Sequence, residues 1–157
     1  MKTYLGIDWA TNEDESATVC ILNRMNDGNV KTTIIEFTLK TPAAQVELVE
    51  RLIEEHDPNG VVAGLGFGQV QCQMLQYKFG DRVKSCYYSA SRDVVRYNAE
   101  TWMLTVNKDQ MMEEAIKTIG GPFKLINMTS NGLHALNFAY IAYVSDVKSS
   151  LPEVVNV

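Results

Sequence analysis

The sequence predicts an α/β domain built on a mixed β-sheet with helices on its faces. The chain opens with three apolar runs joined by short polar loops, which is typical of an antiparallel meander. After residue 40 the hydrophobic period changes to helical spacing, and helical segments then alternate with short apolar runs. Such alternation is typical of βαβ units, whose strands pair in parallel. With 157 residues, the chain has the size of one domain.

The first half of the chain contains clear signals for where elements begin and end. The expected strands of the meander cover residues 3–9, 17–23 and 30–39, and the Asp27-Gly28 pair between the last two is a strong hairpin signal. Thr41 is expected to cap the first helix, because it precedes a proline, which is favoured at the first helical position.

The later elements are expected from periodicity. Helices are predicted over residues 42–55, 69–79, 108–119 and 130–147, and strands over 61–65, 83–88 and 101–106. Ser130 is the expected cap of the last helix, and Val70, Met74 and Tyr77 are expected to face inward. This order resembles that of the ribonuclease H-like fold, in which three antiparallel strands precede parallel strands and helices flank the sheet. We expect one domain over residues 1–149 and a loose tail over 150–157.

Composition limits the function classes. No apolar run approaches the ~20 residues that span a bilayer, so we expect no membrane association. Three cysteines without metal-ligand spacing predict reduced thiols and a cytosolic protein. The net charge of -5 gives no overall sign of nucleic-acid binding. A nuclease can nevertheless combine an acidic metal site with a local basic rim.

Asp8 is the first candidate functional residue. It lies at the end of the first expected strand, where apolar residues give way to a polar loop. A carboxylate at such a strand end is a usual first ligand of a divalent metal. An aspartate that only caps a turn has the same appearance in sequence, so both interpretations stay open.

The last helix carries further candidates at its start. Asn131, His134 and Asn137 recur every three residues, which places their polar groups along one side of a helix. Asn131 and His134 would then face the same cleft as Asp8. For His134 alone, a hydrogen-bonded structural role is the favoured interpretation.

The stretch VVAGLGFG, residues 61–68, carries three glycines on alternate positions. A dinucleotide-binding loop needs G-x-G-x-x-G directly after the first strand, whereas this pattern follows the fourth. A tight turn from strand to helix is therefore favoured. Farther along, Arg92, Arg96 and Lys108 surround an aromatic segment, and such cations are candidates for contacts with a phosphate backbone.

In order, these segments resemble the C-terminal nuclease domain of the large terminase subunit of tailed bacteriophages. The resemblance covers nearly the whole chain and is carried by GIDWA with ATVCIL, VVAGLGFGQVQ with LQYKFGDRVKSCYYS, RYNAETWMLTVNKDQMMEEAI, and NGLHALNFAYIA. It implies an endonuclease that cuts concatemeric double-stranded DNA with two Mg²⁺ or Mn²⁺ ions held by acids. It also implies the host-cell cytoplasm as location, and the terminase ATPase domain, the portal and the small terminase subunit as partners.

The acids that this resemblance leads us to expect are only partly present. Asp8 matches the first acid, whereas the second is expected where Gly64 stands. The third falls at Asn131 or His134, depending on the form of the closing motif. The resemblance thus implies Asp8, Asn131 and His134 as catalytic positions, and Asp8, Gly64 and Asn131 as metal positions. An uncharged amide binds a hard cation more weakly than a carboxylate does.

Several explanations are open at this point. The chain is an engineered inactive variant, a naturally degenerate nuclease domain kept for DNA or motor contacts, or an active enzyme with shifted ligands such as Asp14, Glu15 or Glu36. A docking module without enzymatic activity, for the portal or the ATPase domain, is another class. A fragment of an actin or sugar-kinase ATPase is a third, because its strand and glycine turn resemble GIDWAT and GLGFG, although such ATPases need a longer chain.

Overall fold

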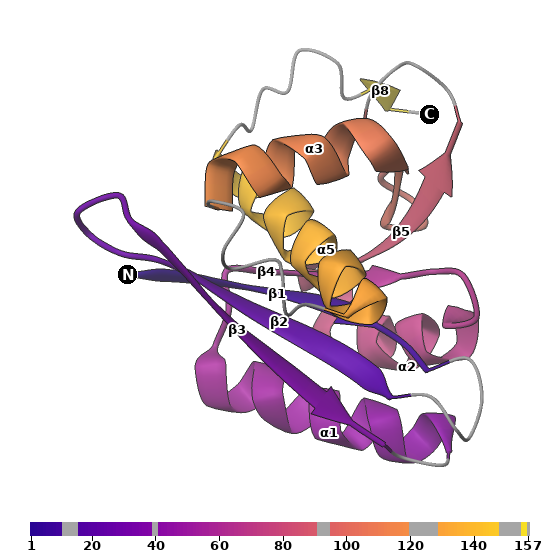
Figure 1. The fold of residues 1–157 in the computed structure, drawn as a ribbon. Helices are drawn as coiled ribbons and strands as arrows, with labels where there is room; N and C mark the ends of the chain where they lie inside the picture. The colour runs from indigo at the N-terminus through magenta and orange to yellow at the C-terminus, as the bar shows by residue number, and fades with distance from the viewer. Residues whose placement is uncertain (11–15, 39–40, 91–94, 120–128, 148–154, 157) are drawn as a thin grey trace.

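The centre of the fold is a twisted sheet (Figure 1). The computed structural model describes residues 1–10, 16–38, 41–90, 95–119, 129–147 and 155–156. Within these residues the sheet has eight strands: β1 (Lys2–Asp8), β2 (Ala17–Arg24), β3 (Val30–Phe37), β4 (Gly60–Gly64), β5 (Val83–Ser89), β6 (Arg96–Asn98), β7 (Met103–Asn107) and β8 (Val155–Asn156). Their order across the sheet is β3-β2-β1-β4-β5-β7-β6-β8.

The pairing confirms the predicted mixed sheet. β1, β2 and β3 form an antiparallel meander, whose second turn contains Gly28 at φ 88°. β1, β4, β5 and β7 then pair in parallel. At the far edge β6 is antiparallel to β7 and parallel to β8.

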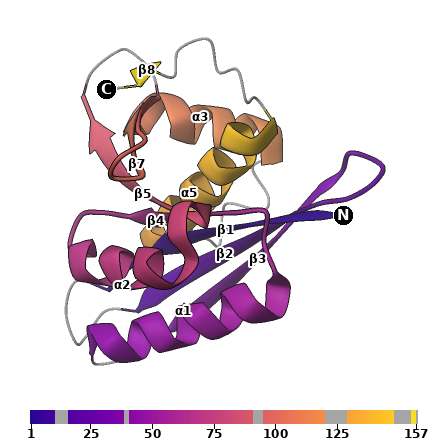
Figure 2. The same cartoon turned by 180° about the vertical axis from the view of Figure 1, so that it is seen from behind.

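Helices cover both faces of the sheet. α1 (Pro42–His56) and α2 (Gln69–Phe79) lie on one face, and α3 (Lys108–Ile119) and α5 (Ser130–Val147) lie on the other (Figures 1 and 2). A 3-10 turn, η1 (Gly80–Arg82), joins α2 to β5. The predicted cap of α1 is confirmed, because the Thr41 hydroxyl accepts a hydrogen bond of 3.1 Å from the backbone N–H of Ala44. No helix among the described residues is long and apolar enough to cross a membrane.

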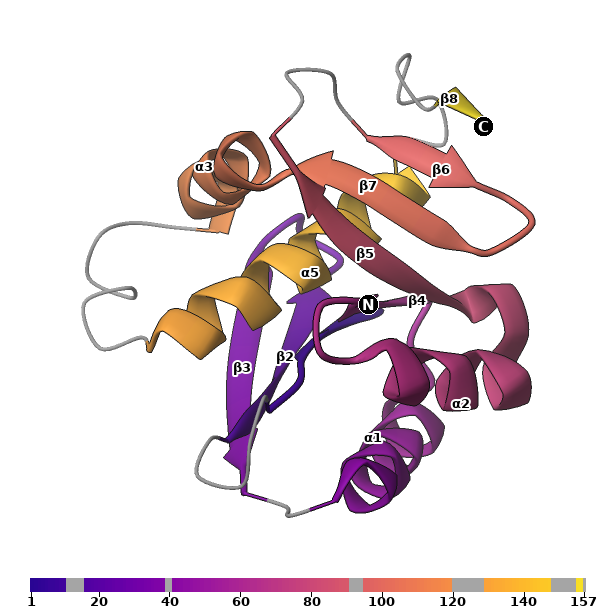
Figure 3. The same ribbon diagram turned by 90° about the vertical axis from the view of Figure 1, so that its right-hand side faces the viewer.

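Alternation along β1 divides the core in two. Leu5 and Ile7 pack with α1 and α2, whereas Tyr4 packs toward α5. Gly6 lies on the α5 side, and a Cβ there would be 2.1 Å from the carbonyl oxygen of Ala135. The absence of a side chain at this position therefore lets α5 rest directly on β1. This contact brings the first turns of α5 to the end of β1 (Figure 3).

Some elements differ from the expectation. β6 lies in a segment for which no strand was expected, and β8, within residues 150–157, pairs Val155 and Asn156 with β6. The cap of α5 is Thr129, one residue before Ser130, since its hydroxyl accepts a hydrogen bond of 3.1 Å from Gly132 N–H. On α2, the inward positions are wrong: Val70, Met74 and Tyr77 are exposed, while Gln71, Cys72 and Leu75 are buried.

Candidate active-site cleft

A cleft of about 300 Å³ opens where β1, β4 and β5 end, beside α5. The carboxyl ends of parallel strands are the usual place for ligands in open α/β sheets. The cleft brings together three of the sequence-predicted positions, Asp8, Gly64 and His134. Its remaining lining comes from the glycine turn, from β5 and from α5: Leu65, Gly66, Phe67, Cys86, Tyr87, Tyr88 and Phe138.

Asp8 ends β1 and is half-buried. Its cross-strand partner is Thr18, whose own partner on β3 is Glu36, so the three side chains share the face on which α5 lies. The Asp8 charge is one of the causes that raise the pKa of Tyr88, after burial and the nearby Cys86. Asp8 therefore lies close enough to the phenol of Tyr88 to affect its ionisation.

A chain of hydrogen bonds holds His134 at the cleft. The side-chain amide of Asn137 donates to the Tyr88 hydroxyl over 3.2 Å, and that hydroxyl is 3.3 Å from Nδ1 of His134. The Tyr88 oxygen accepts from Asn137 and can in addition either donate to Nδ1 or accept from it, according to the tautomer of His134. The other ring nitrogen, Nε2, takes no part in this bond.

The ionisation states follow from burial. Burial lowers the pKa of His134 below its usual value, and the positive charge of Lys108 lowers it further. His134 is therefore neutral at pH 7. Burial raises the pKa of Tyr88 far above its usual value, so the phenol stays protonated and remains a donor.

Gly64 marks the position of the missing second acid, at the end of β4. A Cβ at this position would be 2.9 Å from Cε2 of Phe138 and 3.0 Å from its Cζ. The Phe138 ring is held there by stacking on Tyr88, with centroids 5.2 Å apart and planes at 17°. The space that a carboxylate side chain would enter is thus occupied by an aromatic ring.

Asn131 lies in the first turn of α5, one turn before His134, and is half-buried without lining the cleft. Of the other proposed ligands, Asp14 and Glu15 lie outside the described residues. Glu36 is described, and its carboxylate accepts a hydrogen bond of 2.9 Å from the Thr129 hydroxyl. Its side chain thus helps to fix the cap of α5.

The donor set does not fit a two-metal centre. Two bound divalent ions need several carboxylates to offset their charge. In the part of the chain that the structure describes, no group of three or more His, Cys, Asp or Glu side chains is placed to hold a metal. Asp8 is the sole carboxylate among the described residues that line the cleft, and Nδ1 of His134 is already hydrogen-bonded to the Tyr88 hydroxyl.

The three cations proposed for DNA contacts are not gathered in one place. Arg92 lies outside the described residues. Arg96 is exposed on β6. It pairs with Thr105 of β7, and Thr105 pairs with Tyr87 of β5, so Arg96 and Tyr87 share the face of the sheet opposite Tyr88. Lys108 begins α3 and lies near His134, whose pKa it lowers. Lys108 does not line the cleft, but it lies near enough to affect His134 there.

The glycine turn after β4 serves packing. A Cβ at Gly68 would be 1.9 Å from Cδ1 of the buried Trp9, so this position must lack a side chain. Gly66 has no atom within 4 Å of its Cβ position, and the positive φ of the turn falls on Phe67 at 59°. The tight-turn interpretation is favoured by this contact with Trp9.

Sequence reasoning missed the residues that arrange the cleft. Tyr88 was expected only as the last residue of the strand over 83–88 and not as a site residue, although its two-residue spacing from Cys86 on β5 puts both on the α5 face. Phe138 was not singled out, and its contact with Gly64 joins positions 74 residues apart. Strand alternation was a signal for Tyr88, whereas no local pattern pointed to the Phe138 contact.

Comparisons with known proteins identify the fold. No protein-family profile matches the sequence, and no curated protein gives a significant match. RuvC from T. thermophilus, solved with a Holliday junction substrate, aligns with TM-score 0.53 and 11% identity over 94% of this chain and 97% of its own. Fowlpox virus resolvase, solved with Holliday junction DNA, aligns with TM-score 0.50 and 13% identity over 95% and 99%.

A third solved structure, the large terminase nuclease of a thermophilic phage, aligns with TM-score 0.41 and 13% identity over 89% of this chain and 81% of its own. Because the sequence identities are low, the likeness to the first two structures shows the fold alone. The strand order and the helices on both faces agree with that likeness. The chain therefore has the ribonuclease H-like fold.

Proposed function

We propose that this chain is the DNA-binding, nuclease-like domain of a DNA-packaging terminase, and that its cleft lacks a complete two-metal centre. The fold and a cleft at the carboxyl ends of its parallel strands support a nucleic-acid site. Two solved proteins of similar fold are bound to Holliday junction DNA. The terminase assignment rests on the sequence resemblance, which also supplies the ATPase domain, the portal and the small subunit as proposed partners in the host-cell cytoplasm.

The observation that carries this proposal is the contact between Gly64 and Phe138. Hydrolysis of a phosphodiester by two Mg²⁺ or Mn²⁺ ions needs carboxylates on both sides of the site. At Gly64 the side chain is missing, and Phe138 lies 2.9 Å from where its Cβ would be. The cleft therefore supports binding of DNA better than its cleavage.

The remaining cleft residues have the chemistry of phosphate recognition. In the tautomer in which Nδ1 accepts from Tyr88, neutral His134 offers its Nε2–H as a donor, and Lys108 supplies a positive charge near it. Phosphate oxygens accept hydrogen bonds from such groups, which position a protein on the backbone without reading its sequence. Asp8 opposes this charge, so we expect moderate affinity that falls steeply as salt rises.

The test restores the missing acids. We compare the wild type, the Gly64→Asp/Asn131→Asp variant and a matched Gly64→Asn variant, which has a side chain of the same size at position 64 but no added charge. Duplex DNA binding is measured by fluorescence anisotropy in EDTA, and plasmid nicking is measured with Mn²⁺. We expect the wild type and Gly64→Asn to bind without cutting, and the double aspartate variant to gain Mn²⁺ binding.

Two results would contradict the proposal. Wild-type binding to DNA that is absent in EDTA and restored by Mn²⁺ would show that a metal completes the site. A double aspartate variant that folds but gains no Mn²⁺ binding would show that positions 64 and 131 are not the acid positions. The thermal midpoint of each variant separates misfolding from either result, because the Phe138 ring must shift by a few tenths of an ångström to admit a Cβ.

A metal-dependent endonuclease with shifted ligands is the second candidate. One observation favours it: Asp8 and His134 line the same cleft, and the sequence places Glu13, Asp14 and Glu15 shortly after Asp8. This candidate predicts Mn²⁺-dependent nicking by the wild type that Asp8→Asn abolishes.

A further inference from the structure

The outer face of α2 and the turn before it carry exposed apolar side chains, here called the α2 stripe: Phe67, Val70, Met74 and Tyr77. Their exposed fractions are 80%, 58%, 41% and 96%. The spacings of four and three residues place Val70, Met74 and Tyr77 in one line along the helix, and Phe67 lies in the turn that precedes it. Periodicity predicted three of these residues to lie in the core, but the core takes Cys72 and Leu75 instead. Packing within the domain therefore does not explain their apolar character.

The size of the α2 stripe is typical of a binding surface. Tyr77 exposes nearly all of a side chain of a kind that buries about 150–250 Å², and Val70 and Met74 add to this area. The total is on the order of several hundred Å², the range in which the largest apolar patch of a monomer is often functional. A groove of about 510 Å³ runs along Val70, Met74 and Tyr77, and its charged lining residues are Glu50 of α1 and Lys78 of α2.

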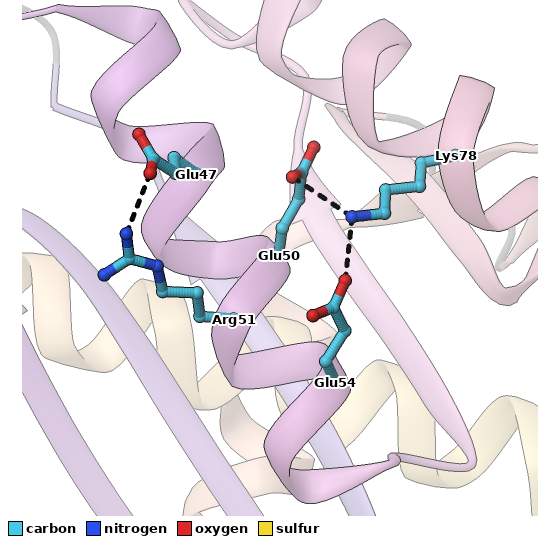
Figure 4. A network of polar contacts seen from close by, with 5 residues as sticks. All are labelled: Glu47, Glu50, Arg51, Glu54 and Lys78. Atoms are coloured by element: carbon cyan, nitrogen blue, oxygen red, sulfur yellow. Dashed lines mark hydrogen bonds and ion pairs between the residues drawn. The ribbon is translucent and has the colours of Figure 1, made fainter.

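The wall of the groove formed by α1 is acidic. Glu50 and Glu54 share the ammonium group of Lys78, at 3.4 and 2.7 Å, while Glu47 pairs with Arg51 at 2.8 Å (Figure 4). One lysine between two carboxylates leaves a surplus negative charge beside the apolar stripe. A partner with positive charges at the edge of its own apolar face would complement this surface.

We propose that this groove binds an amphipathic helix of another polypeptide, whose apolar face is flanked by Lys or Arg. An apolar line with three- and four-residue spacing offers the ridges into which a second helix packs. A second copy of this chain would bring the same acidic wall and a net charge of -5, which opposes self-association. Phe67 also lines the cleft, but the groove itself shares no lining residue with the cleft, so the proposal stands apart from the cleft's function.

The probe is a synthetic helical peptide of about 16 residues made of Leu, Ala and Lys, with Leu at three- and four-residue spacing and Lys on both flanks. Its matched control has Glu in place of every Lys. Binding to the full chain is measured by fluorescence anisotropy. We expect the Lys peptide to bind at least about tenfold more tightly than the Glu peptide, which corresponds to ~1.4 kcal/mol.

Two variants locate the binding surface. Met74→Glu/Tyr77→Glu replaces exposed side chains. We expect it to weaken binding of the Lys peptide at least about tenfold without loss of folding. Glu50→Gln/Glu54→Gln is expected to weaken binding of the same peptide several-fold. Its matched control, Glu113→Gln/Glu114→Gln on α3, removes the same charge far from the groove and is expected to have no effect.

Three results would overturn the proposal. Equal binding of the Lys and Glu peptides would remove the argument from charge, and full binding by Met74→Glu/Tyr77→Glu would place the peptide elsewhere. The third result comes from sedimentation equilibrium. If the wild type forms a dimer and Met74→Glu/Tyr77→Glu abolishes it, the groove binds a second copy of this chain. A monomeric wild type with peptide binding confined to the groove is the supporting result.

Discussion

Replacing Gly6 by alanine should destabilise the protein strongly, because α5 rests on this position. The added Cβ would be 2.1 Å from the carbonyl oxygen of Ala135 and 2.2 Å from the backbone nitrogen of Ala139, whereas ordinary contact begins at 3.4 Å. Both neighbours are backbone atoms of a helix, so no side chain can rotate away. The helix must move from β1 by about 1 Å, which weakens its dispersion contacts along the sheet.

The expected cost is at least about 3 kcal/mol, the upper end of what overpacking usually costs. For a domain of this size that is a fall in melting temperature of roughly 6–12 °C. Urea denaturation monitored by circular dichroism measures it, and Gly66→Ala is the matched control, because its Cβ position has no atom within 4 Å. The control should change stability by less than about 1 kcal/mol. Equal stability of the two variants would refute the packing of α5 on β1.

Three further predictions concern the cleft and the cap of α5. The pKa of His134 in the folded protein lies below its unfolded value near 6.5. Between these two pKa values the unfolded state therefore binds more protons than the folded state does. The free energy of unfolding should therefore fall as pH drops through 6.5, and Lys108→Ala should raise the His134 pKa in an NMR titration. Tyr88→Phe should cost about 1–3 kcal/mol in urea denaturation, because it leaves the buried amide of Asn137 without its acceptor; an unchanged midpoint would contradict this. Thr129→Ala should cost about 0.5–2 kcal/mol through loss of the α5 cap, whereas Thr129→Ser should retain most of the stability.

The sequence predicted the main elements because their signals are local. The Asp27-Gly28 turn, the Thr41 cap and the change of hydrophobic period each depend on neighbouring residues, and the structure contains the elements that they indicate. β6 was missed because a strand of three residues has no measurable period. Its pairing depends on β7, which local sequence does not specify.

The faces of α2 show why packing could not be predicted in the same way. This helix has apolar residues on two sides, so helical spacing alone fits either side to the core. The sheet selects the side with Cys72 and Leu75, because these residues reach β4 and its neighbours. The sequence therefore predicted an amphipathic helix correctly and assigned the wrong face.

The sequence predicted some residues of the candidate site, but not the contacts that hold them in place. Asp8 and His134 could be placed near one another from the expected fold, and the cleft brings them together. The bonds that fix His134 come from Tyr88 and Asn137, and the ring that fills the space at Gly64 comes from a distant helix. Such contacts depend on tertiary structure and have no signature in a single sequence.

Calorimetric titration of Mn²⁺ into the wild-type chain tests the central claim most directly, because it counts the ions that the cleft holds. Asp8→Asn serves as the matched control, since it removes the sole carboxylate among the described residues of the cleft. With so few anionic ligands, we predict no saturable binding of two ions that depends on Asp8. Binding of two Mn²⁺ ions per chain by the wild type, lost in Asp8→Asn, would contradict the claim that the two-metal centre is incomplete.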